Sequence, residues 1–211
     1  MSNKEYYNNI YQNELYYIWN RAPGKDVIIE TINEYTTTDN LNLLDIGCGV
    51  GYLLNRIHKE SKHKFNLYGL DSSIVAINKG KINYPYINLY CEDGENTNFK
   101  DNMFDVVISY GSLEHFNNPE NAIKEISRIL KPNKYFFCSI PTLDIDKTNN
   151  KEGWYEEKEI TNHTIKQFQW NLYRDTWESY FIKNNLELFN IDESKRFGAI
   201  NPGVFYYGFK R

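Results

Sequence analysis

Residues 41–51 read LNLLDIGCGVG and set the fold class of this 211-residue chain. The first six form a short apolar run with strand character, and the segment that follows them contains three glycines within five residues. Glycines at such a point allow a tight turn and a close approach of the backbone to a ligand. Helical spacing begins at Tyr52. The segment therefore predicts a strand, a ligand-binding turn and a helix.

Strand and helix patterns alternate on both sides of this turn. The predicted strands are 41–46, 65–70, 87–91, 104–110 and 135–140, and the predicted helices between them are 52–60, 73–81 and 119–130. The run FDVVISY at 104–110 is apolar almost throughout, which is typical of a strand covered on both faces. Repeated strand–helix–strand units produce right-handed crossovers. We therefore predict an α/β, doubly wound, mostly parallel sheet with helices on both faces.

The end of the chain departs from this alternation. A helix is predicted at 174–184, and strands are predicted at 186–191 and 204–209, with a turn at Asn201-Pro202-Gly203 but no helix between them. Two late strands joined in this way predict an antiparallel edge pair, which brings the sheet to seven strands. We expect one domain, with a ligand-binding core at 41–141 and a closing unit at 171–211.

The first 39 residues are predicted to form an N-terminal helical cap. Tyr7, Tyr11, Leu15 and Ile18 recur at the spacing of one apolar helix face, and Trp19 lies beside them. Such a helix either docks to complete the core or covers a ligand as a lid. The sequence leaves both possibilities open.

Residues 142–170 form a second segment outside the alternation. This insert is polar and is predicted to be irregular, but it contains several aromatic or ionisable residues: Trp154, Tyr155, His163, Phe168 and Trp170. Loops of this length inside a compact domain are usually functional or disordered, and the aromatic residues argue against disorder. We therefore expect the insert to contribute to the binding of a substrate.

Composition excludes several classes of function. The formal charge is −4, with 24 basic residues scattered among 28 acidic ones, so the basic stripe that binds nucleic acid is missing. No apolar run approaches the roughly 20 residues needed to cross a bilayer, and the N-terminal residues lack the apolar stretch of a secretory signal. We expect a cytoplasmic protein that binds neither nucleic acid nor membranes.

The cysteines and acidic residues give no metal-binding pattern. Cys48, Cys91 and Cys138 are far apart and form no C-x-x-C pair, so reduced and mostly buried thiols are expected. Because no His, Cys, Asp or Glu cluster has the spacing of metal ligands, we predict a metal-independent protein.

The glycine spacing separates two kinds of nucleotide-binding turn. A dinucleotide enzyme would show G-x-G-x-x-G, whereas the third glycine here is Gly51 and the bulky Tyr52 follows it. The observed G-x-G-x-G spacing therefore disfavours a bound pyrophosphate.

The segment LLDIGCGVGYLL resembles the first motif of the class I S-adenosylmethionine-dependent methyltransferases. The resemblance implies that its acidic residue and turn approach the methionine part of the cofactor. The implied residues are Asp45, Gly47, Cys48, Gly49 and Gly51.

Two later segments extend this resemblance. In YGLDSS, Asp71 matches the acidic residue that holds both ribose hydroxyls, with Ser72 beside it, and a carboxylate suits this role because it accepts two hydroxyl donors at once. CEDGENTNF is similar to the adenine-binding stretch, in which Asp93 would receive the adenine amino group and Gly94 would meet the ring. Here Thr97 and Asn98 depart from the usual Leu-Pro.

The segment FDVVISYGSLEHF resembles a subgroup of this family in which a Leu-Glu-His segment follows the fourth strand and lies beneath the sulfonium of the cofactor. Tyr110 closes this strand and is counted with the cofactor-binding residues. After RILKP the subgroup has two glycines, whereas this chain has Asn133 and Lys134; asparagine tolerates the left-handed backbone of such a turn.

His115 is the first candidate for a general base, because it follows the strand at which a doubly wound sheet opens its ligand crevice. His115 could instead only order the turn or pack under the cofactor. Glu114 could be a structural acid that points away. His163 is the second candidate, or else a surface histidine. Three tyrosines could close over the cofactor or touch the acceptor, or could simply pack: Tyr6, Tyr7 and Tyr11. Arg174 could pair with an acidic acceptor, or could be a solvated charge on a helix.

The sequence thus predicts transfer of a methyl group from S-adenosylmethionine to oxygen or nitrogen of a small polar acceptor. A sugar or nucleotide-linked precursor of a bacterial surface polysaccharide fits the polar, aromatic insert. We expect the protein to be a monomer or a homodimer. Its expected binding partner is the small-molecule acceptor. The alternatives are a non-catalytic S-adenosylmethionine-binding regulator and an NAD-dependent oxidoreductase on a similar sheet.

Overall fold

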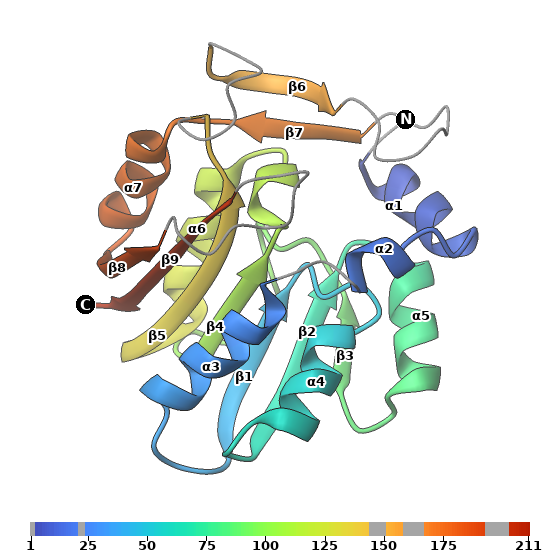
Figure 1. The fold of residues 1–211 in the computed structure, drawn as a ribbon, viewed down its shortest axis with the longest axis horizontal. Coiled ribbons are helices and arrows are strands. Elements are labelled where there is room, and N and C mark those ends of the chain that lie inside the picture. Colours follow the sequence, from blue (N-terminus) through green and yellow to red (C-terminus); the bar gives the residue numbers. More distant parts are fainter. Residues whose placement is uncertain (1–2, 21–23, 144–150, 158–166, 193–202) are drawn as a thin grey trace.

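A seven-stranded sheet runs through the computed structural model, which describes residues 3–20, 24–143, 151–157, 167–192 and 203–211 (Figure 1). In spatial order, the strands of this sheet are β3 (Asn88–Cys91), β2 (Phe65–Asp71), β1 (Leu41–Ile46), β4 (Phe104–Tyr110), β5 (Leu130–Pro141), β9 (Gly203–Lys210) and β8 (Leu186–Asp192). The helices are α1 (Asn3–Gln12), α2 (Tyr17–Asn20), α3 (Lys25–Tyr35), α4 (Tyr52–Glu60), α5 (Ile74–Asn83), α6 (Pro119–Ile129) and α7 (Arg174–Lys183), with a 3₁₀ turn η1 at Leu113–His115.

The strand directions confirm the predicted doubly wound sheet. Strands β3, β2, β1, β4 and β5 pair in parallel, and β9 pairs antiparallel with both β5 and β8. The strand order turns back on itself between β1 and β4, and the carboxyl ends beside such a point form the ligand crevice of open α/β sheets. The ends of β1, β2 and β4 are therefore where a site is expected.

Helices cover both faces of the sheet (Figure 1). On one face, apolar side chains of α3, α4 and α5 pack with Val106 and Ile108 of β4. On the other face, α6 and α7 pack with Phe104 and Val107 of the same strand. All four of these β4 side chains are fully buried, which confirms the prediction for FDVVISY. Burying each such side chain contributes about 1.5 to 3 kcal/mol, so the core holds the central strands in place.

The predicted continuous N-terminal helix is wrong. Helix α1 ends at Gln12, and the next helix, α2, begins only at Tyr17, so the positions spaced for one apolar face do not share a helix. The reason is local. The Asn13 side chain donates to the Asn9 carbonyl at 2.9 Å, and Glu14 adopts a left-handed φ of 59°. Asparagine side chains compete for backbone groups in this way and end helices.

Helix α3 lies within the predicted helical cap at 1–39, but its bounds were not predicted from the sequence. Ile28, Ile29 and Ile32 form its buried face, and Gly24 precedes it with a left-handed φ of 98°. The isoleucine spacing was the available signal, but it is only one turn long and therefore weak.

The insert at 142–170 is also more regular than predicted. Strands β6 (Gly153–Glu157) and β7 (Gln167–Asn171) pair antiparallel as a separate two-stranded sheet. In Figure 1 this sheet lies beyond the carboxyl ends of the central strands. His163 lies outside the described residues.

The turn at the start of β5 behaves as predicted. Asn133 has a left-handed φ of 59°, at a register shift between the Phe104–Leu130 and Val106–Tyr135 pairs of β4 and β5. Asparagine thus replaces glycine there without disrupting the fold. The three cysteines are free thiols, with Cys91 only partly buried. Among the described residues, none of the helices combines the length and the apolar character that crossing a membrane requires.

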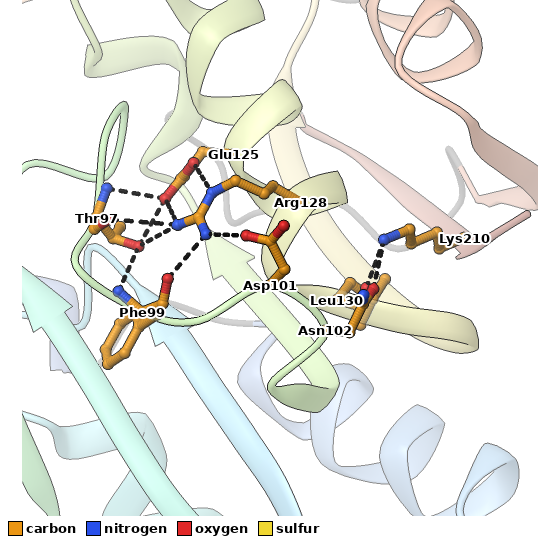
Figure 2. Close-up of polar contacts among 8 residues, drawn as sticks. All are labelled: Thr97, Phe99, Asp101, Asn102, Glu125, Arg128, Leu130 and Lys210. Atoms are coloured by element: carbon orange, nitrogen blue, oxygen red, sulfur yellow. Dashed lines mark hydrogen bonds and ion pairs between the residues drawn. The ribbon is translucent and has the colours of Figure 1, made fainter.

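A polar network fixes the connection between β3 and β4 (Figure 2). Arg128 of α6 donates to Glu125 Oε2 at 2.8 Å, to the Phe99 carbonyl at 2.8 Å and to Asp101 Oδ1 at 2.6 Å. The Thr97 amide and hydroxyl donate to Glu125 Oε1 at 2.8 and 2.6 Å. These contacts explain the departure from Leu-Pro at 97–98, because threonine joins the connection to α6 through hydrogen bonds.

A second contact ties this connection to the last strand. Lys210 of β9 donates to Asn102 Oδ1 at 2.8 Å and to the Leu130 carbonyl at 3.0 Å (Figure 2). The segment that precedes β4 is therefore held at both of its ends.

Replacing Arg128 with alanine tests the importance of the network. Arg128→Ala leaves the buried Glu125 carboxylate without its cation, so we expect the free energy of unfolding in urea to fall by about 2 to 4 kcal/mol. Arg56→Ala is the matched control, because Arg56 pairs with the more exposed Asp26 and Glu60 and should cost less than about 1 kcal/mol. Equal losses in the two variants would contradict the special role of Arg128.

Candidate active site

The turn after β1 requires glycine at defined positions. Gly47 and Gly49 have left-handed φ values of 77° and 56°. A Cβ on Gly47 would overlap the side chain of Ser112, and one on Gly49 would lie 2.5 Å from Tyr11 Oη. Both the backbone conformation and the close neighbours therefore exclude larger residues.

This turn is bonded to the end of β2. The amides of Gly47 and Cys48 both donate to the Leu70 carbonyl at 2.9 Å. Asp71 accepts from the Gly49 amide at 2.9 Å through Oδ2 and from the Ser73 amide at 2.8 Å through Oδ1. The structure thus brings the glycine turn and Asp71 together, and these amides serve the turn itself. A ligand here would meet glycine backbone and carboxylates.

Two buried carboxylates dominate the electrostatics of the site. Burial raises the pKa of Asp71 to about 6, and the Ser73 and Gly49 amides oppose this shift. Burial also raises the pKa of Asp45, helped by the charge of Asp71 and opposed by Lys25. Asp45 Oδ1 is buried and accepts no hydrogen bond within the described part of the chain. Such a pair favours a positively charged ligand.

Lys25 provides the nearby positive charge. Its side chain is buried, and burial lowers its pKa to about 8, although Asp45 opposes this shift. Its Nζ lies 4.6 Å from the centre of the Tyr110 ring, within the range of a cation–π contact. Tyr110 therefore faces the start of α3, and burial raises its own pKa.

Helix α1 lies above α5, at the side of the sheet where β3 is the edge strand (Figure 1). Tyr11 is buried against Val50 and Ala76, and burial together with the charge of Asp71 raises its pKa. Asn8 Oδ1 accepts from Ser73 Oγ at 2.7 Å. The helix therefore completes a small apolar cluster next to Asp71, as the docking interpretation predicts. A role as a lid over a ligand stays a prediction.

The turn η1 carries the first candidate base. His115 Nε2 lies 3.7 Å from Glu114 Oε1, and the Tyr7 ring contacts the His115 ring edge-on at 6.0 Å. Glu114 is buried, which is compatible with the structural acid that the sequence allowed. Trp170 of β7 contacts the residues just after this turn: its Nε1 donates to the carbonyls of Phe116 and Asn117 at 3.1 and 3.2 Å.

The predicted adenine-binding residues lie beyond β3. Asp93 is exposed, and its Oδ1 accepts from the Glu95 amide at 3.0 Å. Gly94 is buried, and a Cβ there would lie 2.8 Å from the Phe116 ring. The carboxylate is therefore accessible at the rim, while the glycine packs closely.

Three predicted residues have other contacts. The Cys48 thiol donates to the Gly49 carbonyl at 3.4 Å and lies against Gly69, so it faces β2. The Ser72 carbonyl accepts from the Cys91 thiol at 3.5 Å. Arg174 forms an ion pair with Glu178 at 3.0 Å, one helical turn away.

Lys25 is the main residue that sequence reasoning missed. A lysine in the first turn of a helix opposes the helix dipole, which is an available signal that such a residue has a partner elsewhere. Among the described residues, no group of three or more His, Cys, Asp or Glu side chains is arranged to hold a metal ion.

The sequence is similar to known methyltransferase sequences over its central part. Residues 44–138 match the family described as "Methyltransferase domain". The chain is 29% identical over 112 residues to a malonyl-[acyl-carrier protein] O-methyltransferase of Priestia megaterium, covering 51% of this chain and 40% of that protein. It is 33% identical over 93 residues to the human mitochondrial arginine-hydroxylase NDUFAF5, covering 44% and 26%. The chain thus spans less than half of either relative.

Solved structures share the fold over nearly the whole chain. A chain from a complex that contains the Haloferax volcanii Trm112 methyltransferase activator superposes with a TM-score of 0.76 and 14% identity over 97% of both chains. An S-adenosylmethionine-dependent methyltransferase of Methanosarcina mazei superposes with a TM-score of 0.69 and 18% identity, covering 85% of this chain and 96% of the other. These similarities establish a Rossmann-like methyltransferase fold.

The raised pKa of Asp71 predicts how the free energy of unfolding depends on pH. Because the folded pKa is about 6 and the ordinary value is 3.8, this group contributes stability below pH 4 that is lost as pH rises through 6. We expect Asp71→Asn to remove this loss, so its unfolding free energy relative to wild type should rise by up to about 3 kcal/mol between pH 4 and 7, as measured by urea unfolding.

Asp105→Asn is the matched control with the opposite sign. Burial opposes ionisation of Asp105, but Lys131 at 2.8 Å, the Asn42 amide and Lys134 together hold its pKa below the ordinary value. Its stabilisation is present above pH 3.8 and is lost as pH falls. The relative stability of Asp105→Asn should therefore fall with rising pH, and slopes of the same sign in both variants would contradict the assignment.

Proposed function

We propose that this chain is an S-adenosylmethionine-dependent methyltransferase that modifies oxygen or nitrogen of a small polar acceptor. The observation that carries this proposal is the contact between the glycine turn after β1 and the Asp71 carboxylate after β2. The match of residues 44–138 to a methyltransferase domain and the fold both support it, and they indicate S-adenosylmethionine as the cofactor.

The residues at the carboxyl edge fit this cofactor. Asp71 would hold the ribose hydroxyls, and the buried Oδ1 of Asp45, which lacks a partner among the described residues, would face the charged methionine part. Asp93 is exposed at the rim and would receive the adenine amino group. The remaining proposed cofactor contacts are Gly47, Cys48, Gly49, Gly51, Ser72, Gly94 and Tyr110.

The proposed reaction needs little covalent catalysis by the protein. When bound, the cofactor supplies a methyl group on a sulfonium that is already an excellent donor. The chain would align the acceptor and exclude water, which is where effective molarity arises. His115 would take the proton of the acceptor hydroxyl or amine, and the neighbouring Glu114 carboxylate would stabilise the imidazolium that forms.

The hairpin β6–β7 is the proposed acceptor region. Gln169 and Asn171 of β7 are buried, and their side chains form a hydrogen bond of 2.9 Å. Buried amides on this element, together with its aromatic residues, support a polar acceptor such as a sugar or nucleotide-linked precursor of a bacterial surface polysaccharide. His163, in the same insert, stays a second candidate base.

Ligand titration by calorimetry tests the cofactor. We expect S-adenosylmethionine and its demethylated product to bind and NAD not to bind; binding of NAD alone would favour an oxidoreductase. Asp71→Ala should weaken cofactor binding by about 1.5 to 3 kcal/mol, the range for hydrogen bonds to charged groups. Asp39→Ala, which removes an exposed carboxylate before β1, should leave the affinity unchanged. Full affinity in a folded Asp71→Ala variant would refute the ribose role.

His115→Ala separates catalysis from binding. A general base contributes roughly 10²- to 10⁴-fold, so turnover in an assay of labelled methyl transfer should fall within that range while cofactor affinity stays nearly constant. His63→Ala, at the opposite end of the sheet, is the matched control. Parallel losses of turnover and cofactor affinity would show that His115 is structural, and binding without turnover across a broad acceptor panel would favour a regulator.

A further inference from the structure

The turn that carries the candidate base is weakly held by its own backbone. Turn η1 has three residues, and its internal hydrogen bonds run from the amide of His115 to the Ser112 carbonyl at 3.0 Å and from the amide of Phe116 to the Leu113 carbonyl at 3.4 Å. A single 3₁₀ turn has poor hydrogen-bond geometry and is marginal alone. Contacts from other elements must therefore set its position.

Each end of this segment is held by a different part of the fold. At the start, Ser112 Oγ donates to the Gly47 carbonyl at a long 3.4 Å. At the far end, the Asn118 amide donates to Glu95 Oε1 at 3.0 Å. Between them, the carbonyls of Phe116 and Asn117 accept the indole N–H of Trp170 from strand β7.

We propose that Trp170 is a positioning residue whose indole N–H, shared by the Phe116 and Asn117 carbonyls, fixes the turn that carries His115. This inference rests on the proposed function, because His115 is the proposed base. It assigns to the hairpin β6–β7 a second role: the element that would bind the acceptor also places the group that deprotonates it.

The surroundings of Trp170 support its role in positioning His115. Trp170 is partly buried against the core cluster beneath α6, so its ring cannot reorient freely and its N–H direction is defined. The His115 ring is itself held by Tyr7 on one side and lies near Glu114. Movement of the 116–117 backbone would therefore shift the imidazole relative to Tyr7, which belongs to helix α1.

Trp177 provides a matched control. It is the fully buried tryptophan of α7, and its Nε1 has no hydrogen-bond partner in the described part of the chain. Trp170→Phe and Trp177→Phe each remove an indole N–H and shrink an aromatic ring. Only the first removes a hydrogen bond to the segment beside His115.

Nuclear magnetic resonance of the histidine rings tests the positioning role without any assay of activity. The full chain has four histidines, and His115→Gln would identify the His115 signal by its loss. We expect Trp170→Phe to shift or broaden this signal, and Trp177→Phe to leave it at its wild-type position. An unchanged His115 signal in folded Trp170→Phe would overturn the proposal.

A double-mutant cycle tests the consequence for catalysis. Trp170→Phe should lower the turnover number about tenfold or more, because misplacing a reacting group by about 1 Å can cost roughly 10²-fold. In the His115→Gln background the same change should cost less than about twofold. An equal loss in both backgrounds would overturn the proposal. A shifted His115 signal in a protein that methylates no acceptor would support the positioning role and overturn the proposed function instead.

Discussion

One buried carboxylate joins the two turns on which the candidate site is built. Asp71 accepts from the Gly49 amide after β1 and from the Ser73 amide that begins α5, so it fixes the distance between the ends of two neighbouring strands. Burial raises its pKa to about 6, which means that keeping it ionised at neutral pH costs stability. Perturbed carboxylates of this kind occur at functional sites and also in structural networks, so the raised pKa agrees with a site here while the bonds to both turns give Asp71 a structural role as well.

The central sheet could be predicted because its signals are both local and repeated. The strands at 41–46 and 104–110 match the structure residue for residue, since the burial of each strand shows directly as an apolar run. The N-terminal region could not be predicted in the same way. Its helix ends at Gln12 because the backbone after Asn13 turns left-handed at Glu14, a choice that apolar spacing does not reveal.

The same contrast applies to the candidate site. Asp45, Asp71 and the glycine turn follow from motifs that lie at strand ends, where a parallel sheet brings them together. Lys25 and Tyr11 reach the same place from elements before the sheet, and only long-range packing shows this. Asp93 is a candidate by resemblance alone, whereas the Arg128 network that holds the segment after it consists of ordinary charged and polar residues that no motif marks.

The family match separates the same two groups of elements. The matching family covers residues 44–138, the part that holds the glycine turn, Asp71 and η1, whereas α1 and the hairpin β6–β7 lie outside it. The shared part supplies the proposed cofactor side, and function varies with the elements added around a fold. The bonds from Trp170 to the carbonyls after η1 cross this boundary. If His115 is the base, the sequence of the hairpin β6–β7 can vary to fit another acceptor only where Trp170 still holds the segment after η1.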